Sequence, residues 1–469
     1  MHTEQIARLN SSFRDPAGFM FIHEDTLYRQ VNHAGAESYD LLMDSGLYDS
    51  LKKKGWIVEH EEVEGPVADP SRAHKVLRPE PLSFISYPYE WSFGQLKTAS
   101  LRTLQIQLMA LKHNMILKDA SAFNIQFHHG RPVLIDTLSF DPYMEGQIWE
   151  GYKQFCQHFL APLCLMASRD IRLGQLARVH IDGIPLDLTS ILMPRSSWLR
   201  PGMLMHLHLH ARAQKTYAGS DPETADKIGK SRALSRKGLV GIVSGLRSLI
   251  RKLDWKPEGT EWADYYEATN YTGDAFAAKS RHINAFLDEI QPRELWDLGA
   301  NSGHFSRLAS DRGIETVAFD IDPAAVELNF RKVRERQETA LLPLVMDLTN
   351  PSPSIGWAGQ ERESLIERGP VDCAMALALI HHLSISNNVS LDRVAQFFAR
   401  VCRHLIIEFV PKSDSQVKRL LSSRKDIFDN YHEDGFENAF REWFHVRQQK
   451  AVEGSHRTLY WLCRKASGP

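Results

Sequence analysis

The spacing of hydrophobic residues predicts different structures for the two halves of the chain. From about Phe19 to Val63, alternating apolar and polar residues in FMFIHEDTLYRQV are followed by helical spacing, which predicts short strands and a helix. Leu96 to Met115 repeats Leu, Ile and Met at helical intervals, which predicts a long helix with one buried face. A mainly helical pattern runs from Trp149 to about Arg200. The N-terminal half is therefore predicted to be an α+β domain.

The C-terminal half shows a regular alternation of apolar strands and helices after Trp262. Such an alternation is typical of an α/β domain with a largely parallel sheet. Between the halves, the segment from Arg212 to Lys256 holds eleven Lys and Arg residues against four Asp and Glu residues. We interpret it as a basic linker, either a solvated helix or a mobile connector, with a contact to phosphates or an anionic surface as the alternative. The predicted domains are residues 1–210 (α+β), 211–257 (linker) and 258–469 (α/β).

Composition and charge argue against several classes of protein. A chain of 469 residues with 43% hydrophobic and 24% charged residues can bury more than one core. The formal net charge of −2 gives no reason to expect a nucleic acid partner. The five cysteines form no C-x-x-C pair, so we expect buried thiols rather than a zinc or disulfide framework. The N-terminus is polar and no apolar stretch is long enough to span a bilayer, so we expect a cytoplasmic protein.

The segment ELWDLGANSGHFSRLA suggests a ligand site at the end of a strand. An apolar strand ends around Asp297, and Gly299 and Gly303 follow before a helix begins. Glycine permits a sharp turn and close approach of a ligand, and the helix N-terminus is expected to offer free N–H groups to a carboxylate. The G-x-x-x-G spacing differs from the dinucleotide pattern G-x-G-x-x-G and favours a methyl donor over NAD. A turn without any ligand is the alternative.

Acidic residues follow the next two predicted strands. Asp320 ends ETVAFD some 20 residues beyond the glycine turn, where a doubly wound fold places an acid that binds ribose hydroxyls. Asp347 follows LLPLVM, where it can accept a hydrogen bond from the adenine amine; a surface aspartate is the alternative. Asp322 precedes Pro323, so we expect it to cap the next helix rather than to bind a ligand.

The successive segments DLGANSGHFSRLA, VAFDIDPAAVE, VMDLTNP and ALALIHHLSISNNV resemble the motifs of class I S-adenosylmethionine-dependent methyltransferases. The resemblance covers about 200 residues and implies a seven-stranded Rossmann-like sheet, closed by an antiparallel hairpin around WFHV and TLYWLC. It also implies that S-adenosylmethionine (SAM) is the cofactor. The residues it assigns to the cofactor are Asp297, Gly299, Asn301 and Gly303 for the methionine end, Asp320 for the ribose, and Asp347 and Leu348 for the adenine.

Two further segments, EWADYYEATNYTGDAFAAKSRHI and EFVPKSDSQVKRLL, resemble the methyltransferases grouped with the host-specific nodulation protein NoeA. This resemblance names no acceptor, and we expect a small-molecule or glycan-like one. His381 and His382 follow the strand DCAMALAL, at the edge where the acceptor would lie. Either imidazole can act as a general base, and shaping the pocket is the alternative role. Glu408, inside LIIEFV, is a further residue that can face the pocket.

The N-terminal segment LKDASAFNIQFHHGRPVLIDTLSF resembles the catalytic core of protein-kinase-like phosphotransferases. Asp119 and Asn124 reproduce D-x-x-x-x-N, and Asp136 closes VLID, where the second metal ligand would stand. Arg29 is the candidate cation of the small lobe, with Glu37 as its helix partner.

The same segment departs from the kinase pattern. Thr137 and Leu138 replace the usual Phe and Gly, Lys118 replaces the usual Arg, and no glycine-rich loop precedes them. We therefore expect a degenerate kinase-like fold without phosphotransfer. A helix-plus-hairpin domain that presents substrate, with its aspartates in turns, is the alternative.

The histidines of HLHLH, which are His206, His208 and His210, would share one face of a strand and suggest a metal site. Because no other ligand cluster lies nearby in the sequence, we expect packed side chains and no metal. Three functions remain open at this point. They are a methyltransferase, a bifunctional kinase and methyltransferase, and a SAM-binding regulatory protein without turnover.

Overall fold

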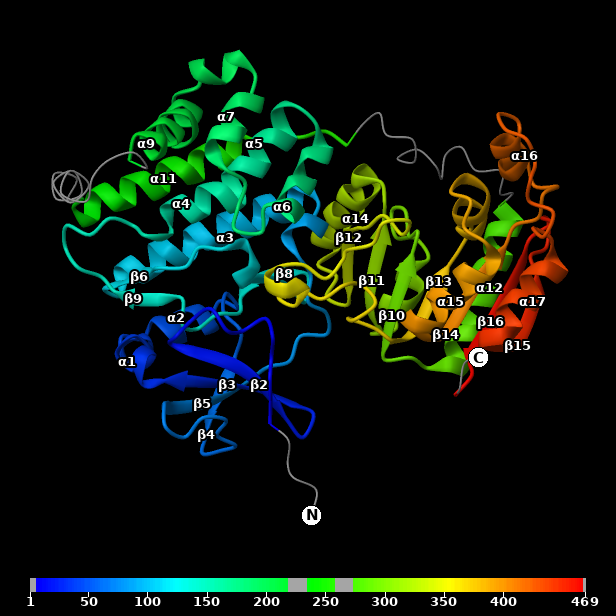
Figure 1. Ribbon diagram of the computed structural model, residues 1–469, viewed down its shortest axis with the longest axis horizontal. Helices are drawn as coiled ribbons and strands as arrows, with labels where there is room; N and C mark the ends of the chain where they lie inside the picture. The colour runs from blue at the N-terminus through cyan, green and yellow to red at the C-terminus, as the bar shows by residue number, and fades with distance from the viewer. Residues whose placement is uncertain (1–5, 218–233, 258–272, 467–469) are drawn as a thin grey trace. The chain divides into compact units, whose positions relative to one another are not determined.

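The computed structural model describes residues 6–217, 234–257 and 273–466, which form a five-stranded sheet, a seven-stranded sheet and two two-stranded sheets. The chain divides into two units (Figure 1). The first contains Met1–Lys256 and Gly356–Glu361, and the second contains Pro257–Ile355 and Arg362–Pro469.

The first unit begins with a five-stranded antiparallel sheet in the order β1-β2-β3-β5-β4. The alternating segment FMFIHEDTLYRQV forms the β2–β3 hairpin, which turns at Glu24 and Asp25 with positive φ at both. Alternation places Phe19 and Phe21 in a buried cluster with Val76. The strands are β1 (Ala7–Arg8), β2 (Gly18–His23), β3 (Thr26–Asn32), β4 (His60–Val63) and β5 (Ala73–Pro79), and the helices between β3 and β4 are α1 (Ala36–Asp44) and α2 (Leu47–Lys52).

A helical region with two short two-stranded sheets follows. The predicted long helix is α3 (Phe93–Lys112), and a capping box between Ser92 and Gln95 fixes its start. Strand β6 pairs with β9, and β7 pairs with β8. The remaining elements are β6 (Met115–Leu117), β7 (Ile125–His128), β8 (Arg131–Leu134), β9 (Phe140–Pro142), α4 (Gly151–Phe155), α5 (Ala161–Ser168), α6 (Leu176–Val179), α7 (Leu186–Leu192), α8 (Pro201–Met203) and α9 (His210–Tyr217).

Part of the predicted linker is a packed helix instead. Helix α11 (Arg236–Lys252) lies beside α3 in the first unit (Figure 1). Its apolar residues repeat with helical spacing and are buried, namely Leu239, Val243, Leu246 and Ile250. The basic residues that suggested a connector include Lys237, Arg251 and Lys252, which lie on the exposed side of this amphipathic helix. Residues 218–233 of the predicted linker lie outside the described residues.

The second unit contains the predicted seven-stranded sheet, in the order β12-β11-β10-β13-β14-β16-β15. The first five strands of that order are parallel, and β16 and β15 close the sheet as an antiparallel hairpin. The expectation of a Rossmann-like sheet with a closing hairpin is confirmed. The strands are β10 (Glu294–Leu298), β11 (Glu315–Asp320), β12 (Leu341–Val345), β13 (Val371–Ala376), β14 (Cys402–Phe409), β15 (Phe444–Ala451) and β16 (Thr458–Arg464).

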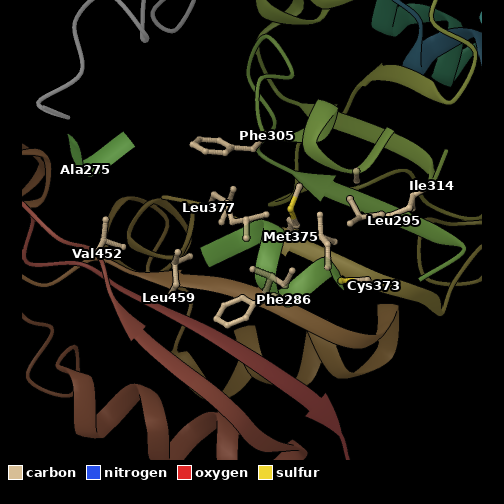
Figure 2. Close-up of a cluster of buried hydrophobic side chains, with 14 residues drawn as sticks. Ala275, Phe286, Leu295, Phe305, Ile314, Cys373, Met375, Leu377, Val452 and Leu459 are labelled. Atoms are coloured by element: carbon tan, nitrogen blue, oxygen red, sulfur yellow. The ribbon is translucent and has the colours of Figure 1, made fainter. Parts of the chain in front are cut away.

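Helices cover both faces of this sheet. They are α12 (Gly273–Ile290), α13 (Ser306–Ser310), α14 (Pro323–Arg336), α15 (Leu391–Val401), α16 (Ser415–Leu421) and α17 (Glu433–Trp443). Figure 2 shows one buried cluster, to which α12 contributes Phe286, β13 contributes Met375 and β16 contributes Leu459. Tyr460, the next residue of β16, contacts Phe436 of α17. Because successive residues of a strand point to opposite faces, α12 and α17 lie on opposite sides of the sheet.

Within residues 6–217, 234–257 and 273–466, no helix combines the length and the apolar composition that crossing a bilayer requires.

Candidate functional site

The carboxyl end of β10 leads into a tight turn that only certain residues can form. Gly299, Asn301 and Gly303 have φ values of +85°, +49° and +75°. A Cβ atom on Gly303 would lie 2.4 Å from the amide nitrogen of Asn329. Both the backbone conformation and the packing of α14 therefore require glycine at position 303.

The N–H groups of this turn are already used within the protein. Gly299 and Ala300 donate to the carbonyl of Phe319, Asn301 donates to Asp320, Ser302 to the Asn301 side chain, and Gly303 to the Ala300 carbonyl. The backbone N–H groups of residues 299–303 therefore have partners within the protein. The turn instead fixes the position of the Asp320 carboxylate, whose Oδ2 lies 2.7 Å from the Asn301 nitrogen.

Arg307 of α13 holds the same turn from the other side. Its guanidinium donates to the carbonyls of Ser302 and Gly303 at 3.0 and 2.9 Å, and it pairs with both carboxylate oxygens of Glu338 at 2.8 Å. Arg307 is 5% exposed. Arg307 was not predicted as a site residue, because no local sequence pattern connects it to Glu338.

Asp320 ends β11 beside the turn, as predicted. Its carboxylate accepts hydrogen bonds from the backbone nitrogens of Asn301 and Asp322 at 2.7 and 2.8 Å. The backbone of Ile321 also donates to Asp320. A carboxylate has about four lone-pair positions, so about one remains for a hydroxyl of a ribose. Burial raises the pKa of Asp320 to about 6. Asp322 caps α14 by accepting from the Ala324 nitrogen, with Pro323 in the first turn, which confirms its predicted structural role.

Asp297 lies on β10 directly before the turn and is buried. It accepts a hydrogen bond of 2.6 Å from Ser306 at the start of α13. Burial raises the pKa of Asp297 to about 7, against the opposing effects of Ser306 and of the Lys279 ammonium. A cationic group placed beside Asp297 would favour its ionised form.

Asp347 and Leu348 follow β12, where the adenine was expected. The Oδ1 atom of Asp347 accepts from the backbone nitrogen and the hydroxyl of Thr349 at 2.8 and 2.6 Å. This local turn occupies one carboxylate oxygen, which is the role of an ordinary turn aspartate. Both residues are partly exposed.

His381 and His382 lie beyond the carboxyl end of β13, next to a π-helical turn over His382–Ser386. Their ring centroids are 4.2 Å apart. His381 is 1% exposed, and neither of its ring nitrogens has a hydrogen-bond partner. Burial lowers the pKa of His381 well below its usual range and that of His382 to about 4. Leaving a buried imidazole unpaired costs on the order of 1–3 kcal/mol per group, so His381 is a strong candidate for contact with a ligand.

A buried ionic network lies near the same edge of the sheet. Glu408 of β14 is fully buried and accepts from the Lys279 ammonium of α12 at 2.7 Å. Arg457, just before β16, lies 3.8 Å from Glu408 and donates to Asp414 at 2.8 Å. Lys279 also lies 4.6 Å from the centre of the Phe305 ring. Glu408 was a candidate from the sequence, but its ionic partners Lys279 and Arg457 come from distant segments and were not predicted.

The predicted kinase-like residues of the first unit do converge. Asn124 donates to the Ser139 hydroxyl at 3.2 Å, and that hydroxyl donates to Asp136 at 2.6 Å. The side chain of Asn124 also donates to Asp119. These contacts link the loop after β6 to the loop after β8.

Arg29 is the cation of this group, as expected, but its acidic partner differs from the prediction. Arg29 of β3 forms an ion pair with Asp136 at 2.6 Å, although Glu37 was expected as its partner, and it also donates to Thr137. Burial alone would raise the pKa of Asp136, but Arg29 and the hydrogen bonds to this carboxylate lower it. A guanidinium therefore lies against the carboxylate that a metal ion would need.

The HLHLH histidines have separate partners. His206 bonds to the Tyr152 hydroxyl at 2.8 Å, His208 lies between the hydroxyls of Ser190 and Ser197, and the ring of His210 stacks on that of Tyr152. These contacts agree with the expectation that the three histidines are packed side chains.

Comparison with known proteins gives one relative over nearly the whole chain. The nodulation protein NoeA of Rhizobium meliloti (strain 1021) is 36% identical over an alignment of 467 residues. The alignment covers 97% of this chain and 95% of that protein. No model of a protein family matches the chain.

Two solved structures illustrate weaker similarities. Magnesium protoporphyrin IX methyltransferase from Synechocystis PCC 6803, solved with bound SAH, covers 44% of this chain and 93% of its own at 15% identity and a TM-score of 0.31. The bifunctional kinase-methyltransferase WbdD covers 46% of each chain at 15% identity and a TM-score of 0.29. These scores are too low to support an argument, so the fold assignment rests on the strand order. The identity and coverage shared with NoeA show that this chain belongs to the NoeA family.

Proposed function

We propose that this protein is a SAM-dependent methyltransferase whose second unit holds the cofactor. The observation that carries the proposal is the position of Asp320. Its carboxylate is buried at the carboxyl end of β11, oriented by backbone donors and beside the turn of Gly299–Gly303. In an open α/β sheet, ligands bind at the carboxyl ends of the strands near the point where the strand order reverses, and β10 lies at that point here.

The carboxylates of this site fit the chemical groups of SAM. Asp320 keeps acceptor capacity for a ribose hydroxyl, and Asp297 is an acid beside which the ammonium of the methionine end can lie. Asp347 keeps one carboxylate oxygen outside its turn for the adenine amine. Arg307 acts as a positioning residue, because it holds the carbonyls of Ser302 and Gly303. When bound, the cofactor supplies an electrophilic methyl group.

The acceptor would lie against His381. Transfer of a methyl group to a hydroxyl or amine releases a proton, and a neutral imidazole can accept it. His381 is neutral at neutral pH, but its lowered pKa makes it a weak base until an acceptor binds. Its two unpaired nitrogens support a hydrogen bond to the acceptor. We propose a small-molecule or glycan-like acceptor, for which orientation next to the methyl group is the main requirement.

Comparison of metabolites tests the proposed activity. Extracts of a strain that lacks the gene should contain a species lighter by one methyl group than its counterpart in the parent strain. Adding the purified full-length protein and SAM to the mutant extract should restore the heavier species. An unchanged methylated pool, with a protein that binds SAM normally, would favour a regulatory role without turnover.

A bifunctional kinase and methyltransferase is the second candidate. The convergence of Asp119, Asn124 and Asp136 favours it. The ion pair between Arg29 and Asp136 opposes it, because the guanidinium satisfies an oxygen that Mg²⁺ would need. We therefore propose that the first unit has a kinase-like arrangement without phosphotransfer.

A further inference from the structure

The hairpin between β7 and β8 carries two adjacent histidines beside a carboxylate. His128 ends β7, His129 begins the turn, and Glu80 follows directly after β5. Their ligand atoms all lie within 4.8 Å of one another. All three residues belong to the first unit, and they take no part in the proposed methyl transfer.

The distances suit a tetrahedral metal ion. The Nε2 atom of His128 lies 3.3 Å from Oε1 of Glu80. Zinc binds imidazole nitrogen and carboxylate oxygen at about 2.0–2.2 Å, so neighbouring ligand atoms of a tetrahedral site are about 3.3–3.5 Å apart. The separation of the His128 and Glu80 ligand atoms already matches this range, and the imidazole of His129 needs to approach by at most about 1.5 Å.

The backbone of the turn sets the position of His129. His129 and Gly130 have φ values of +47° and +70°, and His128 pairs with Arg131 across the hairpin. A two-residue turn with positive φ at both positions prefers Asn-Gly, and histidine is also among the residues enriched at positive φ. The hairpin therefore accommodates His129 directly beside His128. The imidazoles of His128 and His129 lie with their centroids 3.9 Å apart.

We propose that Glu80, His128 and His129 bind a divalent transition metal ion, with Zn²⁺ as the best match to a carboxylate and two imidazoles. Three protein ligands leave a fourth position for water. The ion would connect the end of β5 to the β7–β8 hairpin and would stabilise the first unit. Both imidazoles must be neutral to bind it, so binding weakens in acid.

Titration of the tag-free, chelator-treated full-length protein with Zn²⁺ tests the proposal. Calorimetry should show one zinc ion per chain, and zinc should raise the thermal midpoint. His129→Asn is the informative variant, because it removes a ligand and restores the Asn-Gly turn. It should keep or raise the thermal midpoint without metal, and it should weaken zinc binding about tenfold or more. Glu80→Gln should weaken binding similarly.

His445→Ala controls for general binding to surface histidine, since His445 is exposed on β15 in the second unit. It should leave zinc binding unchanged. The proposal is overturned if the wild-type chain binds no zinc stoichiometrically. It is also overturned if His129→Asn and Glu80→Gln bind zinc as the wild type does, since the ion would then lie elsewhere.

Discussion

At the scale of single residues, two neighbouring aspartates have different roles. Asp320 accepts from backbone nitrogens and keeps acceptor capacity for a ligand, whereas Asp322 caps α14. Local sequence signals are enough to predict these two roles. Asp320 ends an apolar strand, and Asp322 precedes a proline. The unpaired ring nitrogens of His381 could not be predicted in this way, because they depend on packing that no local motif encodes.

Asp320→Ala should weaken SAM binding by about 1–3 kcal/mol, because a ribose hydroxyl would lose its buried acceptor. Calorimetry with the full-length chain measures this loss. Asp322→Ala is the matched control, which should lower the thermal midpoint through loss of an N-cap worth about 1 kcal/mol and leave affinity nearly unchanged. The opposite pattern would show that the two roles are assigned to the wrong residues.

The pH dependence of SAM binding follows from the two raised carboxyl pKa values, about 7 for Asp297 and about 6 for Asp320. At these two carboxyl groups, the folded free chain binds more protons than the unfolded chain between about pH 4 and 7, so these acids contribute less stability as pH rises through that range. The ammonium beside Asp297 and a ribose hydroxyl that donates to Asp320 both favour the carboxylate forms, so cofactor binding should release protons and tighten as pH rises.

Calorimetry near pH 6 in two buffers of different ionisation enthalpy measures this release. Asp297→Asn should reduce the number of protons released on SAM binding. A binding heat that does not depend on the buffer would contradict the proposed contacts of the cofactor with Asp297 and Asp320.

At the scale of elements, helix α11 shows how composition can mislead. A count of charged residues over 211–257 suggested a connector, although every third or fourth position from Leu239 to Ile250 is apolar and buried. The periodicity of the hydrophobic residues, which identified α3 correctly, also identifies α11. By contrast, Arg307–Glu338 and Lys279–Glu408 join residues far apart in sequence, so no periodicity predicts them.

Two valines on α11 provide a matched test of its packing. Val243 is fully buried and Val240 is 38% exposed. Val243→Ala should lower the free energy of unfolding by about 2 kcal/mol, and Val240→Ala should change it by less than about 0.5 kcal/mol. Denaturant unfolding of the full-length variants measures both. Equal effects would mean that α11 does not pack as described.

At the scale of the whole molecule, the chain combines a first unit of antiparallel and two-stranded sheets with a second unit of seven strands. The sequence predicted the second fold well because strand, turn and acid recur in a regular order from β10 to β12. The first unit was harder to interpret, because its chemistry depends on Arg29 and Asp136, which are distant in sequence and paired in space.

The first unit should show no magnesium-dependent binding of ATP. Arg29 neutralises Asp136, and residues 9–17, between β1 and β2, contain no glycine to bring backbone donors close to phosphates. Calorimetry with Mg²⁺ and ATP measures this directly. Micromolar affinity that disappears in Asp136→Ala, with SAM binding retained, would promote the bifunctional enzyme to the first candidate.

The most direct test of the central claim is calorimetric titration of the full-length chain with SAM and with S-adenosylhomocysteine. We predict one binding site per chain for each compound, and weaker binding of both compounds by Asp320→Ala. A chain that is folded by circular dichroism and binds neither compound would contradict it.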